Sequence, residues 1–234
     1  AGVAVLTRIR DALAAYEAGD DAVIISLDHL DDDNRGLVDQ VLGEGEVSVV
    51  YEGRLRAVSQ ESVLAGVWRV QYLDEGDGVE RDVVEVAAVP SLVSHAVFSD
   101  ARNEIEFDTE SLPDGVANAL PILTEIAGKL TQAVAGSEPH VVNLSLLPCT
   151  DQDIEFLVAT LGSGPAVILS RGYGNCRITS TGTRFAWWVQ YFNSQDSLIL
   201  NSLEISPVPA VVAAAPEDIE DSQARLDEIL EVYR

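Results

Sequence analysis

One stretch of sequence is written twice in this chain, and this repeat constrains the fold more than any other feature. Leu-Gly-x-Gly at residues 42–45 recurs at 161–164, and Trp-x-Val-Gln-Tyr at 68–72 recurs at 187–191. Both recur at an offset of 119 residues, at which 12 of the 49 positions from 42 to 90 are identical. Chance would give roughly three. We therefore expect two copies of one supersecondary unit within the 234 residues.

Both copies begin with the same order of elements. Apolar residues about one turn apart predict a first helix in each copy, once two residues of slippage are allowed. They are Val5, Ile9, Leu13 and Tyr16 in the first copy, and Ile122, Ile126, Leu130 and Val134 in the second. A short apolar strand follows at residues 23–27, which the offset of 119 places on 142–146. Aspartate and threonine residues, which cap helices, then begin a second helix at 31–33 and at 150–153.

Each copy next predicts an antiparallel sheet. Apolar runs separated by short turn signals are typical of a hairpin meander. The predicted strands are 47–51, 55–59, 64–73 and 83–88 in the first copy, and 166–170, 175–180, 184–192 and 198–206 in the second. The expected fold class is α+β: two tandem units, each with helices packed on an antiparallel β-sheet, related by a pseudo-twofold axis.

The remaining segments set the domain boundaries. Residues 91–115 become polar and acidic in their later part, which is typical of a linker or a lid. Residues 216–234 predict a closing helix, because Pro216 suits the first helical position and an apolar stripe follows it. We therefore expect residues 1–110 to form the first copy and residues 111–234 to form the second.

Charge and composition limit the partners and the compartment. The 39 acidic and 14 basic residues give a net charge of −25, which repels nucleic acid and suits a basic peptide or protein, unless it serves only solubility. No run of 18 apolar residues is present, so we expect a protein that is not membrane-embedded. Two cysteines make no disulfide framework, which favours the cytoplasm. The absence of metal-ligand spacing and of hydrolase motifs predicts no metal, no cofactor and no enzymatic activity.

Residues 163–195 differ from the rest of the chain in charge. This segment contains Arg171, Arg177 and Arg184 but neither aspartate nor glutamate. Such a surface in an acidic protein predicts a docking site for another polypeptide. The residues that we expect to contact a partner are Arg171, Gly172, Tyr173, Gly174, Asn175, Cys176, Arg177, Arg184 and Trp188.

Most of these residues belong to the stretch Ser-Arg-Gly-Tyr-Gly-Asn-Cys-Arg at residues 170–177. Its functional interpretation is an exposed turn whose two arginines bind a carboxylate, although the glycines alone indicate no more than a tight hairpin. Cys176 has two interpretations as well. It is a reactive thiol if the flanking arginines lower its pKa, or an inert thiol if it is buried.

Trp188 is a second difference between the copies. Strand alternation places Trp187, Val189 and Tyr191 on one face, which we take to be buried. Trp188 then faces the other way, where the first copy has Arg69. An aromatic residue in place of a charged one is a candidate contact residue, unless a helix or the other copy covers it.

Three motifs of the second copy are specific enough to carry a family resemblance. They are Leu-Gly-x-Gly-Pro at residues 161–165, Ser-Arg-Gly-Tyr-Gly-Asn-Cys-Arg-Ile-Thr-Ser-Thr-Gly at 170–182, and Trp-Trp-Val-Gln-Tyr-Phe-Asn-Ser-Gln-Asp at 187–196. These motifs resemble the C-terminal region of the HupH/HyaF family of hydrogenase expression/formation proteins. Residues 61–73 and 112–123 resemble the same family, so the resemblance covers most of the chain.

The resemblance implies an accessory protein without catalytic residues. Members of the family are thought to act as chaperones for the iron–sulfur small subunit of uptake nickel–iron hydrogenases before export. The resemblance therefore implies the small-subunit precursor as partner, with a thioredoxin-like accessory protein and a rubredoxin as further partners. The alternative function is a metal or iron–sulfur carrier in which a dimer supplies Cys149 and Cys176 from each chain.

Overall fold

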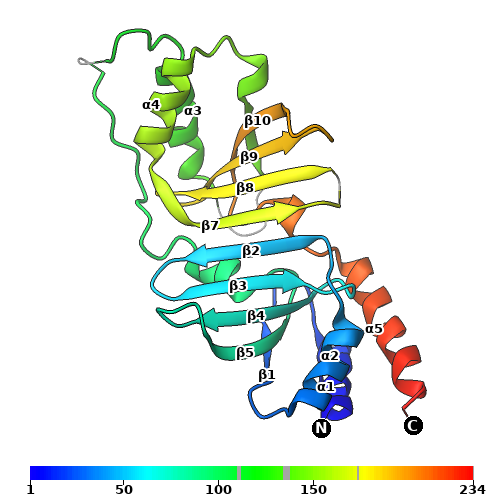
Figure 1. Cartoon of the computed structure of the whole chain (residues 1–234). Helices are drawn as coiled ribbons and strands as arrows, with labels where there is room; N and C mark the ends of the chain where they lie inside the picture. The colour runs from blue at the N-terminus through cyan, green and yellow to red at the C-terminus, as the bar shows by residue number, and fades with distance from the viewer. Residues whose placement is uncertain (110–111, 134–137, 173, 234) are drawn as a thin grey trace. The chain divides into compact units, whose positions relative to one another are not determined.

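The repeated sequence folds into the same order of elements twice in the computed structural model of the chain (Figure 1). The structure describes residues 1–109, 112–133, 138–172 and 174–233. These residues form two units, of which the first contains residues 1–94 and 212–234 and the second contains residues 95–211. Each unit has helices and an antiparallel sheet, which confirms the α+β class and two tandem units. The pseudo-twofold axis stays a prediction.

The first unit has a five-stranded sheet in the order β1-β5-β4-β3-β2. Every pairing between its neighbouring strands is antiparallel. Its elements are α1 (Gly2–Ala15), β1 (Val23–Ser26), α2 (Asp32–Leu42), β2 (Val47–Glu52), β3 (Arg56–Glu61), β4 (Val67–Leu73), β5 (Val79–Val86) and α5 (Pro216–Glu231). A single π-helical turn, η1 (Leu92–Ala96), follows β5.

The second unit has the equivalent sheet order, β6-β10-β9-β8-β7, again with antiparallel pairings. Its elements are α3 (Ala119–Leu130), β6 (His140–Asn143), the short 3₁₀ helix η2 (Leu144–Leu146), α4 (Asp151–Leu161), β7 (Ser163–Ser170), β8 (Asn175–Thr181), β9 (Ala186–Phe192) and β10 (Leu198–Ile205). A second 3₁₀ helix, η3 (Ala210–Val212), follows β10. Each of the eight predicted strands of the meanders is present.

The strand register corrects one part of the predicted alignment. Val23 of β1 pairs with Val86, and His140 of β6 pairs with Ile205. Because Val86 and Ile205 are equivalent at the offset of 119, Val23 corresponds to His140 and not to Val142. The prediction that aligned residues 23–27 with 142–146 is therefore wrong by two residues. The slippage continues through β6, and the two extra residues lie between η2 and α4.

Hydrogen bonds at equivalent positions confirm this corrected alignment. Each is donated by the same type of group and crosses between the same two elements in both units. In the first pair, Trp68 Nε1 donates to the Ala87 carbonyl and Trp187 Nε1 donates to the Ser206 carbonyl. In the second pair, Gly2 N donates to Asn34 Oδ1 and Ala119 N donates to Asp153 Oδ1. In the third pair, Asp82 N donates to Asp28 Oδ1 and Asn201 N donates to Ser145 Oγ.

Asp153 joins the two helices of the second unit. Its Oδ1 atom accepts hydrogen bonds of 2.8, 2.8 and 2.9 Å from the backbone N–H groups of Ala117, Asn118 and Ala119. Its Oδ2 atom accepts one from the N–H group of Thr150, which completes a capping box at the start of α4. Burial raises the pKa of Asp153, but these backbone hydrogen bonds outweigh burial and hold the pKa at about 2.

The C-terminal helix α5 packs in the first unit, although it follows the second copy in sequence. Its residues Ile219, Leu226 and Leu230 belong to the apolar core that α1, α2 and the first sheet enclose. Arg10 of α1 also donates to Asp227 of α5 over 2.6 Å. Packing therefore places α5 in the first unit, although by sequence it belongs to the second repeat copy, and the division into copies at residue 110 stays a prediction. No described helix is both long and apolar enough to cross a bilayer.

Candidate functional site

The turn between β7 and β8 carries most of the residues that we predicted to contact a partner. Arg171, Gly172, Gly174 and Asn175 are exposed there, and Tyr173 lies outside the described residues. Gly174 has a φ of 104°, a left-handed conformation that residues with a side chain rarely adopt. The sequence therefore requires a glycine at this position for the turn to close, and the turn is exposed as predicted.

A depression of about 380 Å³ lies beside this turn. It is lined by Leu169, Ser170, Arg171, Asn175, Cys176, Arg177, Phe192 and Asp196. Arg171 and Arg177 are both exposed, and neither makes an ion pair with any residue that the structure describes. Two guanidinium groups that make no ion pair with the described residues of their own chain, in a protein of net charge −25, are suited to bind a carboxylate of another molecule.

Cys176 lies on β8 next to the turn but is not a reactive thiol. Only 3% of the residue is exposed, and its side chain points to the face that carries Tyr191, its partner across the strands. Burial raises the pKa of the Cys176 thiol to about 11, although a hydrogen bond with Tyr191 opposes this rise. The structure therefore supports the inert interpretation of Cys176, because almost none of the thiol is ionised at neutral pH.

Trp188 is buried, so the prediction that it is exposed to a partner is wrong. It faces away from Trp187 as expected, yet only 9% of it is exposed. It belongs to the apolar core beneath α3 and α4, together with Leu157 and Leu203. Its role is packing, since the helices of its own unit cover the ring.

Arg184 is exposed but lies far from the other predicted contact residues. It is in the turn between β8 and β9, where its guanidinium carbon is 4.7 Å from the centre of the Phe185 ring. A strand advances about 3.3 Å per residue, so the length of β8 separates this turn from Arg171 by about 20 Å. The structure therefore places Arg171 and Arg177 together and Arg184 elsewhere.

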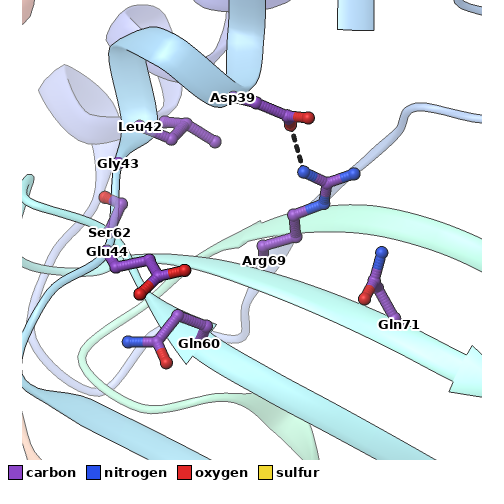
Figure 2. A pocket seen from close by; sticks show the side chains of 8 residues that line it. All are labelled: Asp39, Leu42, Gly43, Glu44, Gln60, Ser62, Arg69 and Gln71. Atoms are coloured by element: carbon purple, nitrogen blue, oxygen red, sulfur yellow. Dashed lines mark hydrogen bonds and ion pairs between the residues drawn. The ribbon is translucent and has the colours of Figure 1, made fainter. Parts of the chain in front are cut away.

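The first unit has a polar pocket at the position that the Trp188 side chain fills in the second unit. This pocket of about 410 Å³ is lined by Asp39, Leu42, Gly43, Glu44, Gln60, Ser62, Arg69 and Gln71 (Figure 2). Arg69, the counterpart of Trp188, rises from β4 toward Asp39 on α2. Its Nε and Nη2 atoms donate to the buried carboxylate of Asp82 over 3.0 and 2.7 Å. Arg35 donates to the same carboxylate.

The second unit replaces this whole ionic network with less charged residues. The residues in the positions of Arg35, Asp39, Arg69 and Asp82 are Ile154, Val158, Trp188 and Asn201. Four charged side chains are lost together, which removes every partner that a charge at position 188 would need. The replacement of all four charged residues can be read from the aligned copies of the repeat. It was the sequence signal for a buried Trp188, because residues that pack against one another are replaced together.

Cys149 is half-buried and Cys176 is buried, and neither is in a disulfide. Among the described residues, no group of three or more histidine, cysteine, aspartate or glutamate side chains is placed to hold a metal ion. Burial raises the pKa of Cys149, as it does that of Cys176. A carrier function would need both thiols within reach of a metal, and Cys176 is buried within its own chain.

Comparison with known proteins adds a family to this geometry. The model of the family described as HupH hydrogenase expression protein, C-terminal conserved region, matches residues 1–106 and again residues 116–233. It therefore matches each copy of the repeat separately.

Individual relatives match nearly the whole chain. The hydrogenase expression/formation protein HoxQ of Cupriavidus necator is 48% identical over 226 residues, which cover 97% of this chain and 79% of the relative. HupH of Rhizobium leguminosarum bv. viciae is 39% identical, covering 97% and 80%. The hydrogenase-1 operon protein HyaF of Escherichia coli is 34% identical, covering 89% and 73%. A solved structure of the HupH protein from Thiobacillus denitrificans is 31% identical, with a TM-score of 0.45, and covers 49% of this chain and 95% of that one.

Proposed function

Because the chain belongs to the HupH hydrogenase expression protein family, we propose that it is a non-enzymatic accessory protein in the maturation of an uptake nickel–iron hydrogenase. The single observation that carries this proposal is the family match over both copies, residues 1–106 and 116–233. Relatives at 34–48% identity carry names of hydrogenase expression or of a hydrogenase operon, which supports the same process for this chain.

The client in this proposal is the immature iron–sulfur small subunit, which the chain binds as a chaperone in the cytoplasm before export. This step comes from the resemblance of the sequence motifs to the family. A thioredoxin-like accessory protein and a rubredoxin are the further partners. The charge of −25 supports a protein client over nucleic acid, because phosphate backbones are repelled.

The turn between β7 and β8 is the proposed contact surface. Its support is the exposure of Arg171, Asn175 and Arg177, together with the lack of ion pairs to the two arginines among the described residues. Gly172 and Gly174 complete the proposed surface as parts of the same turn, and Tyr173, which lies outside the described residues, is included from the sequence alone. Trp188 is not part of it because it is buried, and Arg184 is not part of it because it lies at the other end of β8.

A co-purification experiment tests the proposed function. The tagged chain is expressed in cells that produce the hydrogenase of the same organism, and bound proteins are identified by mass spectrometry. We expect the small-subunit precursor, in an amount that Arg171→Glu and Arg177→Glu each lower. Arg225→Glu on the exposed surface of α5 makes the same charge change in the first unit, and we expect it to keep wild-type capture. Recovery of no hydrogenase subunit with the wild-type chain would contradict the proposed function.

A further inference from the structure

The helices of the second unit leave one end of its sheet uncovered, next to the turn between β7 and β8. Trp188 and Leu203 lie beneath α3 and α4. The next row on the same face starts with Leu169 and Arg177, which pair across β7 and β8 and are both exposed. On β7 and β8 the helix layer therefore ends between these two rows, and the ends of these two strands face solvent.

Apolar side chains continue from this row across β9 and β10, half-buried at Phe192 and exposed at Leu198 and Ile199. Phe192, at the end of β9, pairs with Asn175 on one side and with Leu198 on the other. Ile199 follows Leu198 on β10, and 62% of it is exposed. The register thus makes one continuous surface from the arginine-bearing turn to the start of β10.

The η2 segment extends the apolar surface by two leucines. Leu146 is 81% exposed, and Leu147 beside it is exposed as well. The Asn201 N–H group donates to Ser145 Oγ over 2.8 Å, which holds η2 against β10. We call the set of Leu146, Leu147, Phe192, Leu198 and Ile199 the apolar strip.

The first unit shows that the fold does not need apolar residues at two positions of this strip. The positions of Leu198, Ile199 and Leu200 are occupied there by Val79, Glu80 and Arg81, and His29 stands at the position of Leu146. The same backbone therefore tolerates a glutamate at the position of Ile199 and a histidine at that of Leu146, whereas Val79 keeps the position of Leu198 apolar. Exposed leucine and isoleucine side chains that the fold does not require indicate a surface that another molecule covers.

We propose that the apolar strip, together with Arg171 and Arg177, is the docking surface for one segment of the client polypeptide, in which apolar side chains stand next to a carboxylate. Apolar side chains of the segment cover the strip, and its carboxylate pairs with the two arginines at the border. This inference rests on the proposed function for the identity of the client.

Charge complementarity selects this occupant over two others. The arginines have no acidic partner among the described residues, so a carboxylate supplied by the client gains charge-assisted hydrogen bonds. A second copy of the chain brings another net charge of −25, which opposes self-association. The same charge opposes binding to an anionic membrane surface.

The test measures the Kd of the purified full chain for the hydrogenase small-subunit precursor. Ile199→Glu and Leu146→Glu each place a carboxylate in the strip, so we expect at least about a tenfold weaker Kd. Val79→Glu is the control in the first unit, because Val79 is exposed and stands at the position of Leu198, the strip residue next to Ile199. We expect it to change the Kd by less than twofold. Arg177→Glu weakens binding, and Arg177→Lys restores part of it.

Each outcome decides between explanations. All four glutamate variants change exposed residues, so unchanged unfolding midpoints show that the fold is retained. Wild-type affinity in both strip variants would overturn the inference and leave the proposed function standing. A wild-type chain that does not bind the precursor would overturn both. A dimer that Ile199→Glu converts to a monomer, or vesicles of anionic lipid that only the wild type binds, would assign the strip to another occupant and refute the inference.

Discussion

Removing the buried carboxylate of Asp82 tests the ionic network of the first unit. Only 3% of the Asp82 side chain is exposed, and it accepts hydrogen bonds from Arg69 and Arg35. Asp82→Ala leaves both guanidinium groups without this partner. Breaking a buried ion pair costs about 3–5 kcal/mol, and because both arginines are partly exposed we expect the lower end, about 3 kcal/mol. Asp39→Ala, at the more exposed end of the network, should cost under about 1 kcal/mol.

The second unit supplies a replacement for the whole network. The variant Arg35→Ile, Asp39→Val, Arg69→Trp and Asp82→Asn installs the four residues that stand at the equivalent positions of the second unit. Exchange of a buried ion network for apolar residues of suitable volume is often neutral or stabilising. We therefore expect this fourfold variant to be more stable than Asp82→Ala alone.

Urea unfolding combined with hydrogen-exchange mass spectrometry measures these effects in each unit. Peptides from β4 and β5 report the first unit, and peptides from β9 and β10 serve as the internal control. The expected result is faster exchange in β4 and β5 of Asp82→Ala, with little change for Asp39→Ala. Equal losses of unfolding free energy in Asp82→Ala and Asp39→Ala would refute the claim that burial makes Asp82 the costlier residue to remove. A loss below about 1 kcal/mol for Asp82→Ala would refute it as well.

Three further results are expected in the second unit. The pKa of Asp153 is about 2, below its ordinary 3.8, so its contribution to stability is present above pH 4 and is lost as the pH falls toward 2. Between pH 4 and pH 2, near-ultraviolet circular dichroism should show a smaller loss of tertiary structure for Asp153→Asn than for the wild type. Iodoacetamide at pH 7 should leave Cys176 unlabelled until urea is added. Labelling of the native protein at the rate of a free thiol would contradict the burial of Cys176. Trp188→Ala should cost about 3–5 kcal/mol in urea unfolding, whereas a surface tryptophan would cost little.

The order of the elements was predictable because it depends on local signals. The predicted N-caps are an example: Asp31 accepts a hydrogen bond from the Asn34 N–H group, and Thr150 accepts one from that of Asp153. Such bonds join residues three apart, so one sequence contains all the information that they need. The hairpin meander was predictable for the same reason, since each turn connects strands that are adjacent in sequence.

The partner of α5 and the register of β6 were not predictable in this way. The apolar stripe of α5 shows that the helix is buried on one side, but a stripe does not specify which core receives it. The pairing of His140 with Ile205 depends on residues distant in sequence. Identity between the copies is too low around β6 to place the two-residue slippage, which the equivalent hydrogen bonds then located.

The candidate site was predicted in part. The exposed arginines of the turn follow from glycine-rich sequence and hydrophilic character, which are local properties. Trp188 was assigned to the surface because its counterpart Arg69 was considered alone, without the three charged residues around it. The apolar strip was missed because Leu146 and Leu198 are far apart in sequence and meet only through the pairing of β6, η2 and β10.

The most direct test of the proposed docking surface is hydrogen exchange of the chain with and without the bound small-subunit precursor. We expect slower exchange in peptides that cover residues 169–177 and 192–201. The equivalent peptides of the first copy, residues 50–58 and 73–82, should exchange at the same rate in both samples. Slower exchange confined to the first copy, or equal exchange throughout in a sample that contains the complex, would contradict the account.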